Sequence, residues 1–174
     1  MRIAIAVTAL LAVGGIAFAQ HQHQHQPGSA PYAGLQQRAV KALSDQQLAD
    51  LLAGRGMGLA LAAELNGYPG PIHVLELADQ LQLTDAQRRR MHELTDQMKI
   101  EAVPVGAKLI EHERLLDRAF VSRTITPASL STLTALIGET QGELRAIHLK
   151  YHLTTADLLT PDQRNHYAEL RGYN

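Results

Sequence analysis

Apolar residues recur at spacings of three and four through two long segments, and this pattern constrains the fold more than any other feature of the sequence. The segments run from Asp85 to about Val121 and from Pro127 to Leu158. Such spacings place apolar side chains on one face of an α-helix, as in helices packed nearly antiparallel. The apolar positions are Met91, Leu94, Met98, Ala102, Val105, Leu109, Leu116 and Phe120, then Leu130, Leu133, Ile137, Leu144, Ile147, Tyr151 and Leu158.

The connection between these segments predicts how they pack. Residues 122–126 form a loop short enough to force a helical hairpin. Pro104 lies inside the first helix, where it removes a hydrogen bond and clashes with the preceding turn, so we expect a kink there. We therefore predict an all-α fold, with a long antiparallel hairpin curved by the proline and shorter flanking helices. A thin hairpin cannot bury both of its faces, so we also expect a homodimer.

Three copies of one local pattern mark predicted helix starts: LSDQQ at 43–47, LTDAQ at 83–87 and LTPDQ at 159–163. Each is a capping box, in which the Ser or Thr hydroxyl accepts from the amide three residues on and the Gln there bonds back to the cap amide. The motif residues of the two Thr-containing copies are Leu83, Thr84 and Gln87, and Leu159, Thr160 and Gln163.

Shorter helices are predicted before the hairpin. One begins after Ser44 and runs to about Leu65, with three glycines at 54, 56 and 58 inside it. These glycines indicate close packing or a break rather than a phosphate loop, because no strand precedes them and no Lys-Ser/Thr follows. Asn66-Gly67 should end the helix, and Pro69-Gly70-Pro71 should form a rigid turn. A further helix is expected over residues 72–82.

The N-terminal region predicts export. Residues 1–19 have a positive start, a long apolar run and an Ala-x-Ala site, which is typical of a Sec-type signal peptide. An uncleaved membrane anchor is the alternative, since about 20 apolar residues can span a bilayer. Residues 20–34, with His21, His23 and His25 among glutamines, are predicted to be a disordered tether. Residues 35–174 should form a single helical domain.

Composition excludes several classes of function. The formal net charge is −1, which argues against binding nucleic acid. The absence of cysteine excludes disulfides and thiolate metal sites. His92-Glu93 lacks the second histidine of the zinc-protease motif, and no serine lies in a nucleophile elbow. We therefore expect no enzymatic activity and no organic cofactor.

Histidine pairs at helical spacing are the candidate metal ligands. His148 and His152 are four residues apart and share a helix face, so their imidazoles can hold one Zn, Cu or Ni ion together. The alternative is that they are polar residues at the border between core and solvent. His73 and Glu76 form a second pair on one face, which could complete the site.

A third pair lies on the first long helix. His92 and Asp96 are also four residues apart, and a hairpin centred near Thr124 would place Asp96 opposite His152. Either residue of the pair would then serve as a ligand or as a group that orients one. His112 instead falls within the apolar positions and is expected to be a hydrogen-bonded core histidine.

The two Leu-Thr-x-x-Gln boxes, which flank a proline-containing hairpin behind a signal peptide, resemble the motif of the Spy/CpxP family of periplasmic proteins. The resemblance covers about residues 72–171, and more loosely the stretch from Leu43. It implies a curved antiparallel dimer that acts without ATP. Members of the family include general chaperones, stress-response regulators, and heavy-metal sensors or resistance proteins.

Two functions follow as expectations. The histidines favour a periplasmic protein that senses or buffers a transition metal in envelope stress. The alternative is an ATP-independent chaperone that suppresses aggregation of unfolded clients, although the cradles of such chaperones are typically rich in positive charge and this chain is nearly neutral. A regulatory role through docking on a membrane-bound sensor is a third possibility.

Overall fold

The computed structural model describes residues 30–173, and within them all regular structure is helical. Its contacts divide the chain into Met1–Ala33 and a compact unit, Gly34–Asn174. The predicted signal peptide and most of the predicted tether lie outside the described residues. The elements are η1 (Leu35–Gln37), α1 (Asp45–Leu52), α2 (Leu61–Glu64), α3 (Pro71–Glu76), α4 (Asp85–Val121), α5 (Pro127–Leu158) and α6 (Pro161–Arg171).

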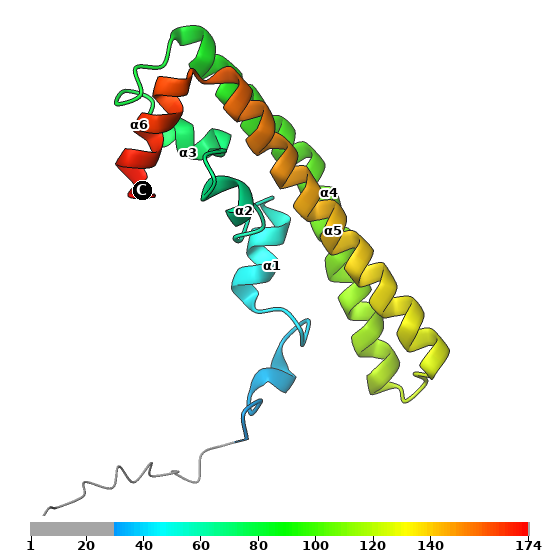
Figure 1. Ribbon diagram of the computed structural model, residues 1–174. Helices are drawn as coiled ribbons and strands as arrows, with labels where there is room; N and C mark the ends of the chain where they lie inside the picture. The colour runs from blue at the N-terminus through cyan, green and yellow to red at the C-terminus, as the bar shows by residue number, and fades with distance from the viewer. Residues whose placement is uncertain (1–29, 174) are drawn as a thin grey trace, which may run out of the picture. The chain divides into compact units, whose positions relative to one another are not determined.

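Helices α4 and α5 form the predicted hairpin, with the bounds that the sequence indicated (Figure 1). They lie side by side and make more contacts with each other than any other pair of described helices does, while α1 and α3 pack against α4. Helix α4 continues through Pro104, which lies at an exposed position. The all-α fold is therefore confirmed, whereas the dimer stays a prediction. None of the helices within residues 30–173 has the length and apolar character needed to cross a bilayer.

The shorter helices differ from the prediction. The helix expected from Ser44 to Leu65 ends at Leu52 and resumes only as the short α2. Positive φ angles of 65° at Gly54, 45° at Met57 and 80° at Gly58 break it, as the glycines had allowed. The helix expected over 72–82 ends at Glu76 and continues as turns.

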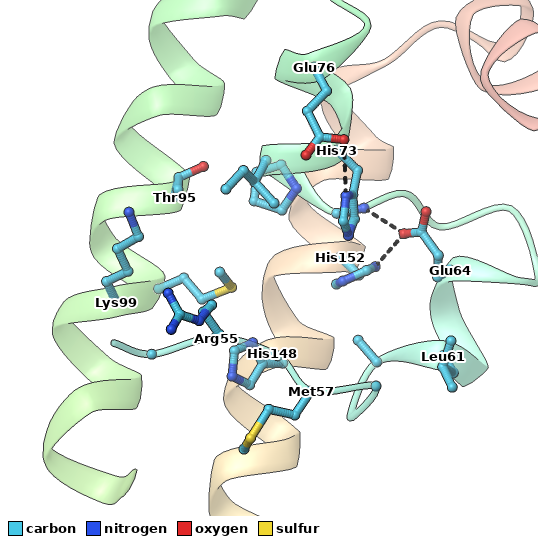
Figure 2. Close-up of a pocket in the computed structure, with 18 of the residues that line it drawn as sticks. Arg55, Met57, Leu61, Glu64, His73, Glu76, Thr95, Lys99, His148 and His152 are labelled. Atoms are coloured by element: carbon cyan, nitrogen blue, oxygen red, sulfur yellow. Dashed lines mark hydrogen bonds and ion pairs between the residues drawn. The ribbon is translucent and has the colours of Figure 1, made fainter. Parts of the chain in front are cut away.

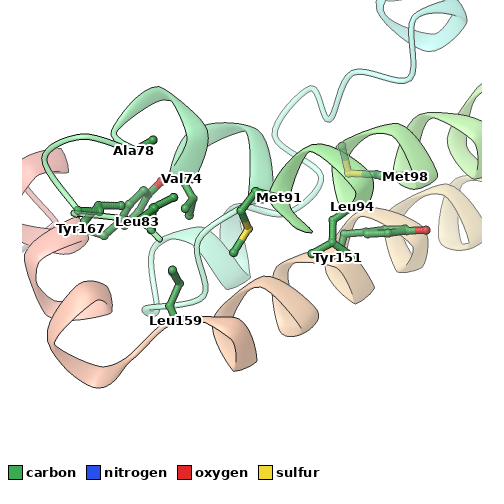
Figure 3. Packing of buried hydrophobic residues seen from close by; sticks show 10 residues of the cluster. Val74, Ala78, Leu83, Met91, Leu94, Met98, Tyr151, Leu159 and Tyr167 are labelled. Carbon is green, nitrogen blue, oxygen red and sulfur yellow. The ribbon is translucent and has the colours of Figure 1, made fainter. Parts of the chain in front are cut away.

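Two buried apolar clusters hold the unit together. The first joins α3, α4, α5 and α6 around Met91, Leu94 and Tyr167, and includes the motif leucines Leu83 and Leu159 (Figure 3). The second joins α1 to the middle of the hairpin through Leu51, Val40, Ala102, Leu109 and Leu144. The α1–α3 region is thus fixed along one side of the hairpin.

All three predicted capping boxes are present. Ser44, Thr84 and Thr160 each accept a hydrogen bond from the amide three residues on, and the glutamine at that position accepts from the cap amide. Thr126 caps α5 in the same way through Ser129, a fourth box that ends in serine rather than glutamine. The caps satisfy amides that would otherwise lack partners at each helix start.

Gln87 and Gln163 also join two helix starts to each other. The side-chain amide of Gln87 donates to the carbonyl of Leu158 and to Oε1 of Gln163, both at 2.9 Å. The amide of Gln163 donates in return to the carbonyl of Leu81 and to Oε1 of Gln87, both at 3.2 Å. Each glutamine thus uses its oxygen as an acceptor and its nitrogen as a donor, which glutamate cannot do. The motif therefore both caps helices and holds α4 and α6 together.

Candidate functional site

A cavity of about 470 Å³ lies between the loop at 53–60 and helices α3, α4 and α5 (Figure 2). Three of the histidines singled out in the sequence line it, together with the sulfur and aliphatic side chains of four apolar residues and two cationic side chains. These lining residues are His73, His148 and His152; Met57, Leu61, Ile72 and Met98; and Arg55 and Lys99. The structure thus places His148, His152 and His73 around one cavity, while their role as metal ligands stays a prediction.

His152 is 7% exposed and its ring is fixed by a hydrogen bond. Its Nδ1 lies 2.7 Å from the carbonyl oxygen of Tyr68, in the turn that follows α2. A carbonyl only accepts, so we assign the proton of the neutral ring to Nδ1. The other nitrogen, Nε2, then carries the lone pair. This is the arrangement of metal-binding histidines, which donate their second N–H to a carbonyl or carboxylate.

Gly70 leaves the Nε2 side of His152 uncovered. A Cβ atom at position 70 would lie 2.9 Å from both Cε1 and Nε2 of His152, and 3.4 Å from Cδ2 of His73. Any side chain there would displace the imidazole or occupy the space beside its free nitrogen. Gly70 has an ordinary φ of −81°, so space rather than backbone conformation requires glycine here.

His148 lies one turn before His152 on α5 and is 2% exposed. Its Nε2 is buried and makes no hydrogen bond within the described part of the chain. Burial, and secondarily the nearby His152, lowers the pKa of His148, so its imidazole is neutral near pH 7. A neutral imidazole with an unpartnered buried nitrogen is chemically suited to receive a metal ion.

Glu64, at the end of α2, is the site residue that the sequence interpretation missed. It is 7% exposed, and its Oε2 lies 3.5 Å from Nδ1 of His152 and accepts from the amide of Gly70 at 3.0 Å. Its Oε1 accepts from the hydroxyl of Tyr167 on α6. The available signal was that Glu64 is the one charged residue in the apolar stretch 59–68.

His73 and Glu76 face one another on α3, as predicted, with 3.5 Å between Nδ1 and Oε2. Glu76 is also bound by Arg171, and the guanidinium of Arg171 is the main cause that lowers the pKa of this carboxyl. Glu76 is therefore engaged by a cation, whereas His73 is half-buried beside Gly70.

The third predicted pair does not join the site. His92 and Asp96 are exposed on α4 and lie outside the cavity lining. The expected placement of Asp96 opposite His152 is wrong, because the hairpin register differs: Lys150 and Tyr151 both bind Glu101, at 2.6 and 2.8 Å. His112 is hydrogen-bonded to Thr140 at 3.0 Å, which confirms the expectation of a satisfied histidine.

Within residues 30–173 no three His, Asp or Glu side chains are gathered closely enough to hold a metal ion together. His148 and His152 therefore offer two nitrogen ligands at most before any rearrangement. The histidines at 21, 23 and 25 lie outside the described residues.

Comparison with known proteins gives one match. Residues 72–171 match the family model described as LTXXQ motif family protein. No curated protein and no solved structure matches the chain.

Proposed function

Since the chain belongs to the LTXXQ motif family of Spy/CpxP-type proteins, which are typically periplasmic, we propose that it binds a transition metal ion in the periplasm and senses or buffers that metal. The observation that supports this most is the hydrogen bonding of two imidazoles, those of His152 and His148. His152 commits Nδ1 to a carbonyl and keeps Nε2 as an acceptor, and His148 keeps a buried nitrogen without a partner. Both side chains line one cavity.

The chemistry of these ligands favours Zn, Cu or Ni, the ions that imidazole suits best. His73 is a further candidate ligand, since it lines the same cavity and lies beside His152 at Gly70. Glu76 is a weaker candidate, because its Oε2 is bound by Arg171. His92 and Asp96, which the sequence suggested, are left out of the proposed site because they are exposed and lie outside the cavity lining.

Thermal unfolding of the metal-free protein with and without each metal tests the proposal. A metal at 100 times its dissociation constant stabilises the native state by about 2.7 kcal/mol, which raises the Tm by several degrees. We expect this rise for at least one metal, and its loss in His148→Ala/His152→Ala. His152→Asn is a second variant that keeps a side-chain donor for the Tyr68 carbonyl.

The matched control is His92→Ala/His166→Ala, because both histidines are exposed and lie away from the cavity. This control should keep the full metal-dependent rise. An unchanged Tm of the native sequence with all three metals would refute the proposal.

A second candidate function, an ATP-independent chaperone, is favoured by exposed apolar side chains on α4. Ile100, Phe120 and Val121 are all largely exposed, and such groups can contact unfolded clients or a second copy of the chain. We likewise propose a homodimer, and a membrane-bound sensor as a partner. Suppression of client aggregation that survives His148→Ala/His152→Ala would separate this function from metal binding.

A further inference from the structure

We infer that Glu64 is a positioning residue of the proposed metal site, and that it stabilises a cation on Nε2 of His152 from the opposite side of the ring. This inference rests on the proposed function. Glu64 is a buried acidic residue whose Oε2 lies 3.5 Å from Nδ1 of His152. It takes no part in the capping boxes or in the exposed ion pairs of the described residues.

The hydrogen bonds of Glu64 place it behind the imidazole rather than in the coordination sphere. Oε2 accepts from the Gly70 amide and faces Nδ1 of His152, while Oε1 accepts from Tyr167. Two oxygens that accept from several donors are typical of an ionised carboxylate, which only accepts. Both oxygens are therefore already engaged, Oε2 by the Gly70 amide beside Nδ1 and Oε1 by Tyr167, so Glu64 supports the ligand instead of binding the ion.

A carboxylate in this position acts on a metal through the ring. Metal on Nε2 makes the imidazole more positive, and a buried negative charge beside Nδ1–H stabilises that state more than water would. Glu64 also holds Gly70 by its amide, and Gly70 is the residue whose missing side chain leaves Nε2 open. Glu64 therefore places a negative charge beside Nδ1 of His152 and, by holding Gly70, keeps the space beside Nε2 open.

Tyr167 fixes the carboxylate from α6. It is fully buried in the first apolar cluster, and burial raises the pKa of its hydroxyl, so that it stays a donor. Arg171 lies over the same ring at 5.5 Å. The carboxylate of Glu64, at the end of α2, is thus held from α6 as well as by the Gly70 amide.

The test is zinc titration calorimetry of the metal-free protein, with Glu64→Gln compared with Glu139→Gln. Gln keeps the size of Glu64 and one acceptor but removes its charge. We expect Glu64→Gln to weaken zinc binding on the order of 10- to 100-fold, the usual effect of losing an outer partner of a metal ligand. Glu139→Gln changes an exposed glutamate on α5 that lies outside the cavity lining, and should change the affinity less than about threefold.

Thermal unfolding without metal separates this role from a structural one. If Glu64 only supports the fold, Glu64→Gln lowers the Tm of the metal-free protein while zinc affinity at low temperature is unchanged, and the inference is overturned. Normal zinc binding by Glu64→Gln with normal stability overturns it as well. Absence of zinc, copper and nickel binding in the native sequence overturns both the inference and the proposed function.

Discussion

Replacing both motif glutamines, Gln87→Glu and Gln163→Glu, should lower the free energy of unfolding by about 3 kcal/mol. Each glutamine donates to a backbone carbonyl before the other motif and to the other glutamine. The double change removes all four donated bonds and leaves carbonyls of Leu81 and Leu158 facing carboxylates. The two carboxylates would also repel each other at close range.

Gln47→Glu is the matched control for this double variant. Gln47 forms the same capping box with Ser44 but is exposed, and its recorded hydrogen bonds within the described residues are those of the box. Glutamate serves a capping box as well as glutamine and favours the positive end of a helix, so stability should stay within about 0.5 kcal/mol. Urea unfolding measures both effects. Equal losses in the control and in the double variant would show that the motif only caps helices.

Gly106→Ala should destabilise the protein by about 3 kcal/mol, by forcing α1 away from α4. A Cβ at Gly106 would lie 2.6 Å from the carbonyl oxygen of Leu51 and 3.1 Å from its carbonyl carbon. These are backbone atoms at the end of α1, so no side-chain rotation can relieve the contact. Leu51 itself is buried in the second apolar cluster, which the shift would open.

Gly138→Ala and Gly142→Ala, on α5, are control variants that should stabilise the protein rather than destabilise it. A Cβ at either position meets nothing within 4 Å. Alanine is the better helix former, so each change should stabilise the protein by about 0.5–1 kcal/mol. Thermal or urea unfolding of the three variants gives the comparison. A neutral or stabilising Gly106→Ala would mean that α1 does not pack on α4 as described.

The hairpin was predictable because two independent signals agree on it. The apolar spacing fixes the helical faces, and the capping box before Asp85 and the short loop before Pro127 mark the two helix starts. The short helices were harder, because the glycines between Leu52 and Leu61 allow both packing and a break. Which of the two occurs depends on contacts with the hairpin, which local pattern does not contain.

The site was predictable in part, because helical spacing shows which side chains share one face of a helix. Helical spacing alone placed His148 beside His152, and His73 beside Glu76. The register between α4 and α5 depends on the loop conformation, so Asp96 was misplaced by spacing alone. Glu64 and the bonds between Gln87 and Gln163 arise only when distant segments meet, and no periodic pattern marks them.

The most direct test of metal binding is an anomalous difference map from crystals of the zinc-loaded protein, collected at the zinc absorption edge. The proposed function predicts a peak about 2.1 Å from one nitrogen of each of His148 and His152, with Glu64 behind the His152 ring. A map with peaks only at exposed histidines such as His92 and His166, or with no peak in the cavity, would contradict it.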